Sequence, residues 1–163
     1  MKQLIVIRHA KSSWDFTSLN DAERPLNERG HKDAPKMAKH LLKQGIAIDA
    51  FISSPAKRAF TTATYFAEAY GKKGKEIIKA PGLYHASEPV VYELLCTLDD
   101  TLSSIAIFSH NPGITTFVNG LTDSSIDFMP TCGVFAVKIQ SDTWKDIMYS
   151  KKEFWFFTAP KML

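Results

Sequence analysis

Short apolar stretches alternate with amphipathic stretches along this chain, and this alternation constrains the fold more than any other feature. The apolar stretches have the length and side-chain types of β-strands, and we expect strands at residues 4–7, 49–53, 76–79, 104–108, 133–139 and 153–158. Helical periodicity or helix-start signals predict helices at residues 34–42, 55–70, 88–98 and 111–121. Strands that alternate with helices favour βαβ units, so we predict an α/β fold around a mostly parallel sheet.

Two local details refine this expectation. Pro35 lies at the start of the first apolar stripe, and proline is tolerated only in the first turn of a helix, so we expect that helix to begin close to it. The last two predicted strands follow each other with only a polar connection between them. This succession predicts one antiparallel edge strand.

The length and composition are those of an ordinary globular protein. We expect residues 1–163 to form a single domain around one core, because 163 residues can bury about 70% of their unfolded surface. No apolar run approaches the roughly 18 residues of a membrane span. Met1 and Lys2 lead directly into the first strand, without the apolar segment of a secretory signal. We therefore expect a cytoplasmic protein with no membrane partner.

Several classes of site are disfavoured by what the sequence contains. Cys96 and Cys132 are too few for a disulfide framework or a tetrahedral zinc site. The net charge of +3 attracts anions mildly, but basic and aromatic residues do not interleave as they would in a nucleic-acid groove. The chain has no GxxxxGK loop and no clustered aspartates for magnesium and a nucleotide. We expect no metal, no cofactor and no nucleic-acid partner.

Polar side chains follow three of the predicted strands at the point where each strand ends. Arg8 and His9 follow the first strand, Arg58 lies in the first turn of the helix after the second, and His110 follows the strand at 104–108. The carboxyl ends of parallel strands share one edge, where open α/β sheets bind ligands. Guanidinium groups grip phosphate oxygens in a fork, and imidazole can act as a nucleophile. The spacing therefore predicts a phosphoryl-transfer site.

The motifs around these residues resemble the histidine phosphatase superfamily. The resemblance rests on the stretches RHAKSSW, SSPAKRAFTTA and SHNPG in this order and spacing, and extends through RPLNERG, LYHAS and FTAPK over nearly the whole chain. The SixA-like phosphohistidine phosphatases are the branch that fits best. The resemblance implies a three-layer α/β/α sandwich of the phosphoglycerate mutase type, with a mostly parallel central sheet and one antiparallel edge strand.

The resemblance also implies roles for individual residues. His9 would be the nucleophile that becomes phosphorylated, Arg8 and Arg58 would clamp the phosphate, and His110 would be the second imidazole. Arg24, in RPLNERG, would be a further residue of the phosphate pocket.

The chemistry sets requirements for the two imidazoles. His9 must be neutral on the attacking nitrogen, so its other nitrogen must donate to an acceptor that the sequence does not identify. His110 serves best as a charged donor to a phosphoryl oxygen, and a bound anion favours its protonated form.

Three more residues are expected to contact substrate. Ser12 follows the nucleophile in a loop, where its hydroxyl can line the entrance. Asn111 opens a helix whose first peptide groups can stabilise a bound anion. His85, in LYHAS, lies near the expected mouth of the pocket.

We hypothesise a metal-independent phosphatase that hydrolyses phosphohistidine on a protein through a phospho-His9 intermediate. Asn111 follows His110 where acid phosphatases and phytases of the superfamily carry an aspartate as general acid, and a leaving imidazole needs less proton help than an alkoxide. One alternative is a phosphomonoesterase that acts on small phosphorylated substrates with Glu88 as general acid. A second is a non-catalytic phosphate-binding module. A Rossmann nucleotide site is disfavoured because the first strand leads to Arg-His and not to GxGxxG.

Overall fold

The structure is a computed structural model that describes residues 1–163. The strands are β1 (Lys2–Arg8), β2 (Ala50–Ser53), β3 (Ile78–Lys79), β4 (Ser104–Ser109), β5 (Val134–Ile139) and β6 (Lys152–Thr158). The helices are α1 (Glu28–Lys43), α2 (Lys57–Ala69), α3 (Glu88–Cys96) and α4 (Gly113–Asn119), with four short 3-10 turns between elements and at the carboxyl terminus. Every strand and helix expected from the periodicity is present, which confirms the α/β fold.

The six strands form one sheet in the order β3-β2-β4-β1-β5-β6. The pairs β2–β3, β2–β4 and β1–β4 are parallel, whereas β5 runs antiparallel to both β1 and β6. The mostly parallel sheet is confirmed. The β5–β6 hairpin pairs with β1 through β5. The one strand that runs opposite to the others is therefore β5, the neighbour of the edge strand β6, and not the edge strand itself.

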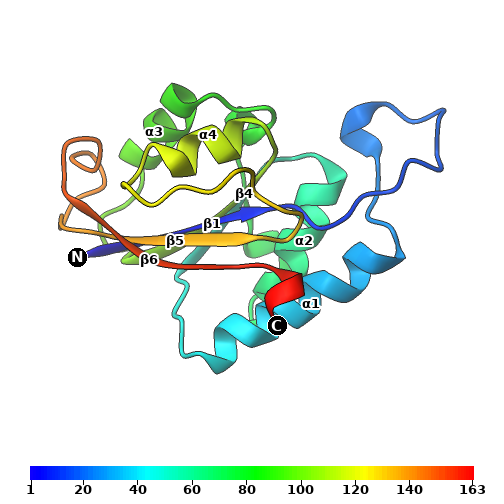
Figure 1. Ribbon diagram of the computed structural model, residues 1–163, viewed down its shortest axis with the longest axis horizontal. Helices are drawn as coiled ribbons and strands as arrows, with labels where there is room; N and C mark the ends of the chain where they lie inside the picture. The colour runs from blue at the N-terminus through cyan, green and yellow to red at the C-terminus, as the bar shows by residue number, and fades with distance from the viewer.

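Helices cover both faces of the sheet (Figure 1). Alternate residues of β1 point to opposite faces, so Leu4 and Val6 join a core cluster that includes side chains of α3 and α4. Ile5 and Ile7 join the cluster that includes α1 and α2. The three-layer α/β/α sandwich is therefore confirmed. No helix has both the length and the apolar character needed to cross a bilayer.

Helix α1 begins earlier than expected. Asn27 caps it by accepting a hydrogen bond from the Gly30 N–H at 2.9 Å, and helical residues begin at Glu28. Pro35 consequently lies inside the helix, so the expectation that it occupies the first turn is wrong. The apolar residues in the sequence begin at Ala34 because they mark the buried face of α1. The first turn of the helix is polar, so the apolar pattern did not reveal where the helix begins.

Candidate active site

A cavity of about 240 Å³ opens where β1, β2 and β4, three neighbouring strands, end. His9 follows β1, Arg58 lies in the first turn of α2, which follows β2, and His110 follows β4. These residues and Arg8 all line the cavity. The structure thus brings together the four residues predicted from the strand ends. The complete lining is Arg8, His9, Lys11, Ser12, Trp14, Asp21, Arg24, Arg58, His85, His110, Asn111 and Thr131.

Backbone contacts fix the segment that carries His9. The His9 N–H donates to the Ser109 carbonyl at 3.2 Å, which ties the end of β1 to the end of β4. The next N–H, of Ala10, donates to Thr62 Oγ1 at 3.0 Å, and the Thr62 hydroxyl donates to the Arg58 carbonyl at 2.8 Å. The nucleophile candidate and the first turn of α2 therefore form one rigid unit.

The His9 ring has the arrangement that a nucleophile needs. Its Nδ1 lies 2.7 Å from the Ala10 carbonyl oxygen, which can only accept, so Nδ1 carries the proton. Nε2 is then left with a free electron pair. Burial, together with the charges of Arg58 and Arg8, lowers the pKa of His9 to about 3, although the bond to Ala10 acts in the opposite direction. The acceptor that sequence reasoning left open is thus the Ala10 carbonyl.

His110 lies beside His9, with 5.2 Å between the ring centroids. Its Nε2 is 2.8 Å from Ser54 Oγ, and its Nδ1 is buried without a protein partner. Burial first, and then the neighbouring His9 and Arg58, lower the pKa of His110 to about 3. These effects favour the neutral imidazole, and the protonated form expected from sequence requires a bound anion to offset them.

The two arginines place positive charge in the cavity, and Arg8 keeps a donor without a partner. Arg8 Nη1 donates to the Met129 carbonyl at 3.0 Å, but Arg8 Nε is buried without a partner. Arg58 donates through Nη1 to the Asp21 carbonyl at 2.6 Å and through Nη2 to Asp21 Oδ2 at 2.9 Å. Burial and the charge of Arg58 both lower the pKa of Arg8. A buried donor without a partner beside a like charge favours an anionic ligand.

Arg24 and Ser12 line the cavity, but they contact each other and the loop around them. Arg24 donates through Nη2 to Ser12 Oγ at 2.7 Å and through Nε to the Ser13 carbonyl at 3.2 Å. Its guanidinium carbon lies 3.3 Å from the ring centroid of Trp14. These contacts hold the loop that follows the nucleophile candidate. They also use the Nε and Nη2 donors of Arg24 within the protein itself.

Asn111 also lines the cavity, and its side chain is occupied. It donates to the Met129 carbonyl at 2.9 Å and accepts from Thr115 Oγ1 at 2.7 Å. The Met129 carbonyl also accepts from Arg8, so Asn111 helps to fix the segment against which Arg8 lies. His85 lies at the cavity, as expected for a residue of its mouth.

Glu88 does not line the cavity. It is the first residue of α3, and a Cβ atom at Gly120, just beyond α4, would lie 2.8 Å from its carboxylate oxygen. This position does not fit a proton donor to a group held between His9 and His110. The dipole of α3 favours a glutamate in its first turn without any catalytic role.

Asp21 is the cavity residue that sequence reasoning missed. It lies in the 3-10 turn η1 (Asp21–Glu23), and its carboxylate accepts from Arg58, from Arg24 at 3.1 Å and from the Tyr84 hydroxyl at 2.6 Å. Only its spacing of three residues from Arg24 was visible in the sequence. Ser54, the partner of His110, lies three residues before the start of α2 at Lys57, and its hydroxyl also accepts from the Ala56 N–H at 3.2 Å.

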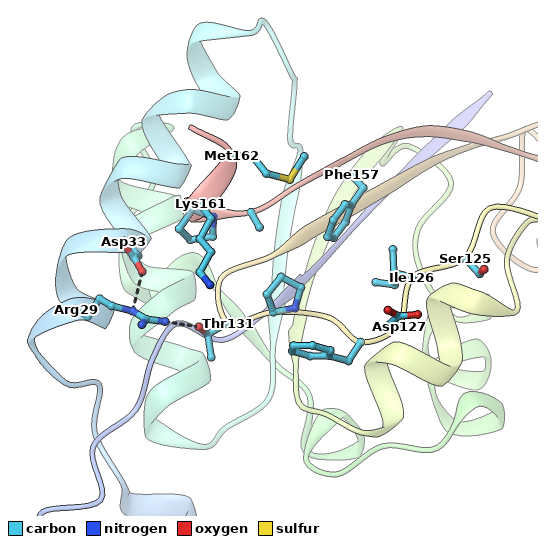
Figure 2. Close-up of a pocket in the computed structure, with 13 residues that line it drawn as sticks. Arg29, Asp33, Ser125, Ile126, Asp127, Thr131, Phe157, Lys161 and Met162 are labelled. Carbon is cyan, nitrogen blue, oxygen red and sulfur yellow. Dashed lines mark hydrogen bonds and ion pairs between the residues drawn. The ribbon is translucent and has the colours of Figure 1, made fainter.

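A larger open groove of about 760 Å³ lies next to the cavity and shares Thr131 with it. Figure 2 shows Arg29 at one end of the groove, between Asp33 and Thr131. Arg29 Nε lies 3.5 Å from Asp33 Oδ2, and Arg29 Nη2 donates to Thr131 Oγ1 at 3.3 Å. Ile126 and Phe157 line its other part. The exposed side chain of Phe128 also lines the groove. The groove therefore combines apolar walls with a charged end beside the cavity.

Residues 4–86 match the family model of the histidine phosphatase superfamily (branch 1). The chain belongs to this superfamily. An uncharacterized chloroplastic protein of Arabidopsis thaliana is 29% identical over 153 residues, which cover 89% of this chain and 70% of that protein. Phosphoserine phosphatase 1 of Hydrogenobacter thermophilus is 40% identical over 83 residues, which cover 48% of this chain but only 36% of that enzyme.

Among solved structures, the protein histidine phosphatase SixA complexed with tungstate superposes with a TM-score of 0.81. The two chains are 21% identical, and the alignment covers 98% of this chain and 97% of SixA. This similarity shows a common fold. The resemblance drawn from the motifs is confirmed for the superfamily and for the phosphoglycerate mutase-like architecture.

The two buried imidazoles of this histidine phosphatase make the fold sensitive to acid. The pKa values of His9 and His110 are about 3 in the folded protein, so the unfolded chain, with histidine pKa values near 6.5, binds more protons between these limits. Stability is therefore lost as the pH falls below about 6.5. We expect a loss of about 2 kcal/mol per histidine between pH 7 and pH 5, measured by urea unfolding. His9→Gln should lose about 2 kcal/mol less, and an identical loss in both proteins would contradict the prediction.

Proposed function

We propose that this protein is a phosphatase that removes the phosphoryl group from phosphohistidine on a protein through a phospho-His9 intermediate. The observation that carries the proposal is the geometry at His9. Its Nδ1 proton is held by the Ala10 carbonyl and its Nε2 electron pair is free, in a cavity lined by Arg8, Arg58 and His110. Positively charged donors fixed before the reaction stabilise the charge that spreads over the phosphoryl oxygens.

Two unpartnered buried atoms support an oxyanion as the ligand. Two buried side-chain nitrogens, Arg8 Nε and His110 Nδ1, have no hydrogen-bond partner. Both belong to residues that line the cavity. A phosphoryl group has three oxygens that can accept from them. The tungstate bound by SixA, a protein of the same fold, supports the same kind of ligand.

A phosphohistidine on a polypeptide is favoured over other phosphoryl donors by two features. Glu88 lies outside the cavity, so it is not placed to protonate the alkoxide that an ester releases, and a leaving imidazole needs less proton help than that alkoxide. The groove that continues from Thr131 gives room for the polypeptide on either side of the phosphorylated residue. Similarity of fold to the protein histidine phosphatase SixA also supports this substrate class.

A phosphate monoester is the second candidate substrate. The 40% identity to phosphoserine phosphatase 1 over 83 residues favours it. A pocket that only binds phosphate is disfavoured, since such a pocket needs the positive charges but has no use for a neutral, oriented His9.

A comparison of substrates tests the proposal. Turnover of a phosphohistidine protein, phosphoserine and p-nitrophenyl phosphate should be measured in the presence of EDTA. We expect the phosphohistidine protein to have a kcat/KM at least about tenfold above those of both esters. Faster turnover of phosphoserine would establish the ester phosphatase instead. Binding of inorganic phosphate without turnover of any substrate would identify a binding module, and loss of turnover in EDTA would refute metal independence.

A further inference from the structure

The mouth of the cavity holds a carboxylate–imidazole pair formed by Asp21 and His85. His85 Nε2 lies 3.3 Å from Asp21 Oδ2, and the two side chains are 52% and 42% exposed. Both residues line the cavity that contains His9. His85 is thus in contact with the cavity and with solvent, as a group that exchanges protons during turnover must be.

The backbone places the His85 ring with some strain. His85 has a φ of 53°, in the left-handed region that residues other than glycine seldom adopt. Its ring centroid lies 4.1 Å from that of Tyr84 and 5.4 Å from that of His110. Gly113 lets this loop approach α4, because a Cβ atom there would collide with the carbonyl oxygen of Ala86. Strained residues of this kind cluster at functional sites.

The groups around the pair keep the Asp21 carboxylate ionised. Burial opposes ionisation of Asp21, but hydrogen bonds from Tyr84, Arg58 and Arg24 and the charge of Arg58 outweigh it, so the pKa of Asp21 lies well below its ordinary range. The carboxylate therefore stays charged and can orient an imidazolium through Nε2. The other titratable or charged groups that face the pair are His110, Arg24, Arg58 and Tyr84.

We propose that His85 is the general acid and base of the reaction and that Asp21 is the positioning residue that orients it. This proposal rests on the proposed function, because it requires phosphoryl transfer to His9. It gives to His85 the role for which Glu88 is misplaced. A carboxylate that fixes the tautomer and direction of an acid–base histidine is a recurring arrangement in hydrolases.

In the first step, the Nε2 electron pair of His9 forms a bond to phosphorus. The bond from phosphorus to the leaving imidazole nitrogen breaks, and its electron pair passes to that ring. The His85 imidazolium donates its Nδ1 proton to the other nitrogen of the leaving ring, which departs as neutral imidazole. The Nδ1 proton of His9 stays on the ring and is donated to the Ala10 carbonyl in a hydrogen bond throughout. The phosphorylated ring is therefore cationic and remains a good leaving group.

In the second step, a water oxygen bonds to phosphorus as the bond to His9 Nε2 breaks. The electron pair returns to Nε2, and one water proton passes to Nδ1 of the now neutral His85. The products are hydrogen phosphate, neutral His9 and the His85 imidazolium paired with Asp21. Protons and charge therefore balance over the cycle, and no further acid or base is needed.

The test uses two ester substrates that differ in their need for a proton. The p-nitrophenolate ion leaves without protonation, whereas the phenolate ion is more basic and benefits from an acid. The variant is His85→Asn, since asparagine tolerates the left-handed backbone of this position. We expect it to slow formation of phospho-His9 from phenyl phosphate by about 100-fold, and from p-nitrophenyl phosphate by less than about fivefold.

Two further variants complete the design. His31→Asn, which replaces an exposed histidine of α1 outside the cavity, should leave both rates unchanged. Asp21→Asn should slow both substrates, because Arg58 also loses its carboxylate partner, and should slow phenyl phosphate more. Equal losses with both substrates in His85→Asn, or no loss, would overturn the proposal. If the wild-type protein formed no phospho-His9 with any substrate, the proposed function itself would fail, and the two failures are therefore distinct.

Discussion

Replacement of His9 by alanine is expected to lower turnover by a factor on the order of 10⁴ or more, the scale of removing a covalent nucleophile. The acid-labile phosphoryl label on the wild-type protein should disappear with it. The physical reason is that Nε2 of His9 is a free, neutral nucleophilic nitrogen oriented by its own backbone, with Nδ1 at 2.7 Å from the Ala10 carbonyl. His110 is not equivalent to it, because its Nε2 contacts Ser54 Oγ and no backbone carbonyl fixes the tautomer of its ring through Nδ1.

The variant should fold. His9 is 6% exposed, and its removal takes away an imidazole that is costly to bury beside Arg8 and Arg58. The measurements are turnover of the best substrate, labelling with a radioactive phosphoryl donor, and a urea unfolding midpoint to exclude loss of structure. His9→Ala protein that keeps both the label and turnover would mean that another residue is phosphorylated, and the mechanism proposed above would be abandoned.

The gathering of Arg8, His9, Arg58 and His110 was predictable from the sequence because of a general property of parallel sheets. Residues that follow strands of the same direction meet at one edge, however far apart they lie in the chain. β2, β4 and β1 are neighbours in the sheet and end together, so the prediction needed only the strand positions and the residues after them. The apolar periodicity supplied those positions.

The contacts of the long loop between β1 and α1 were not predictable in the same way. Asp21 reaches Arg58, Tyr84 and His85, each on a different segment, and no periodic pattern links these positions. Arg24 lines the cavity, where the resemblance put it, but no sequence pattern predicted its contacts with Ser12, Ser13 and Asp21. Loop side chains pair according to tertiary geometry, which local propensity does not encode.

Substitution of Arg8 or Arg58, the two arginines expected to clamp the phosphate, should cause the second largest loss of activity. Arg8→Ala or Arg58→Ala should lower kcat/KM by about 150-fold or more. This factor corresponds to a loss of about 3 kcal/mol in transition-state stabilisation, the effect of losing one preorganised donor in a dry site. Arg58 is 3% exposed, and water cannot readily take its place. Affinity for inorganic phosphate should fall in the same variants, as measured by product inhibition.

Arg58→Lys separates the charge of the guanidinium from its shape. Arg58 already donates twice to Asp21, through Nη1 and Nη2, while the rest of its planar fork remains for the ligand. A lysine keeps the charge but has a single ammonium group, so it cannot bind Asp21 through two nitrogens and also face the phosphate in a fixed direction. We expect an intermediate loss, carried mainly by kcat, because orientation matters most in the transition state. Full activity in Arg58→Lys would show that charge alone suffices, and the argument for a clamp of fixed geometry would then fail.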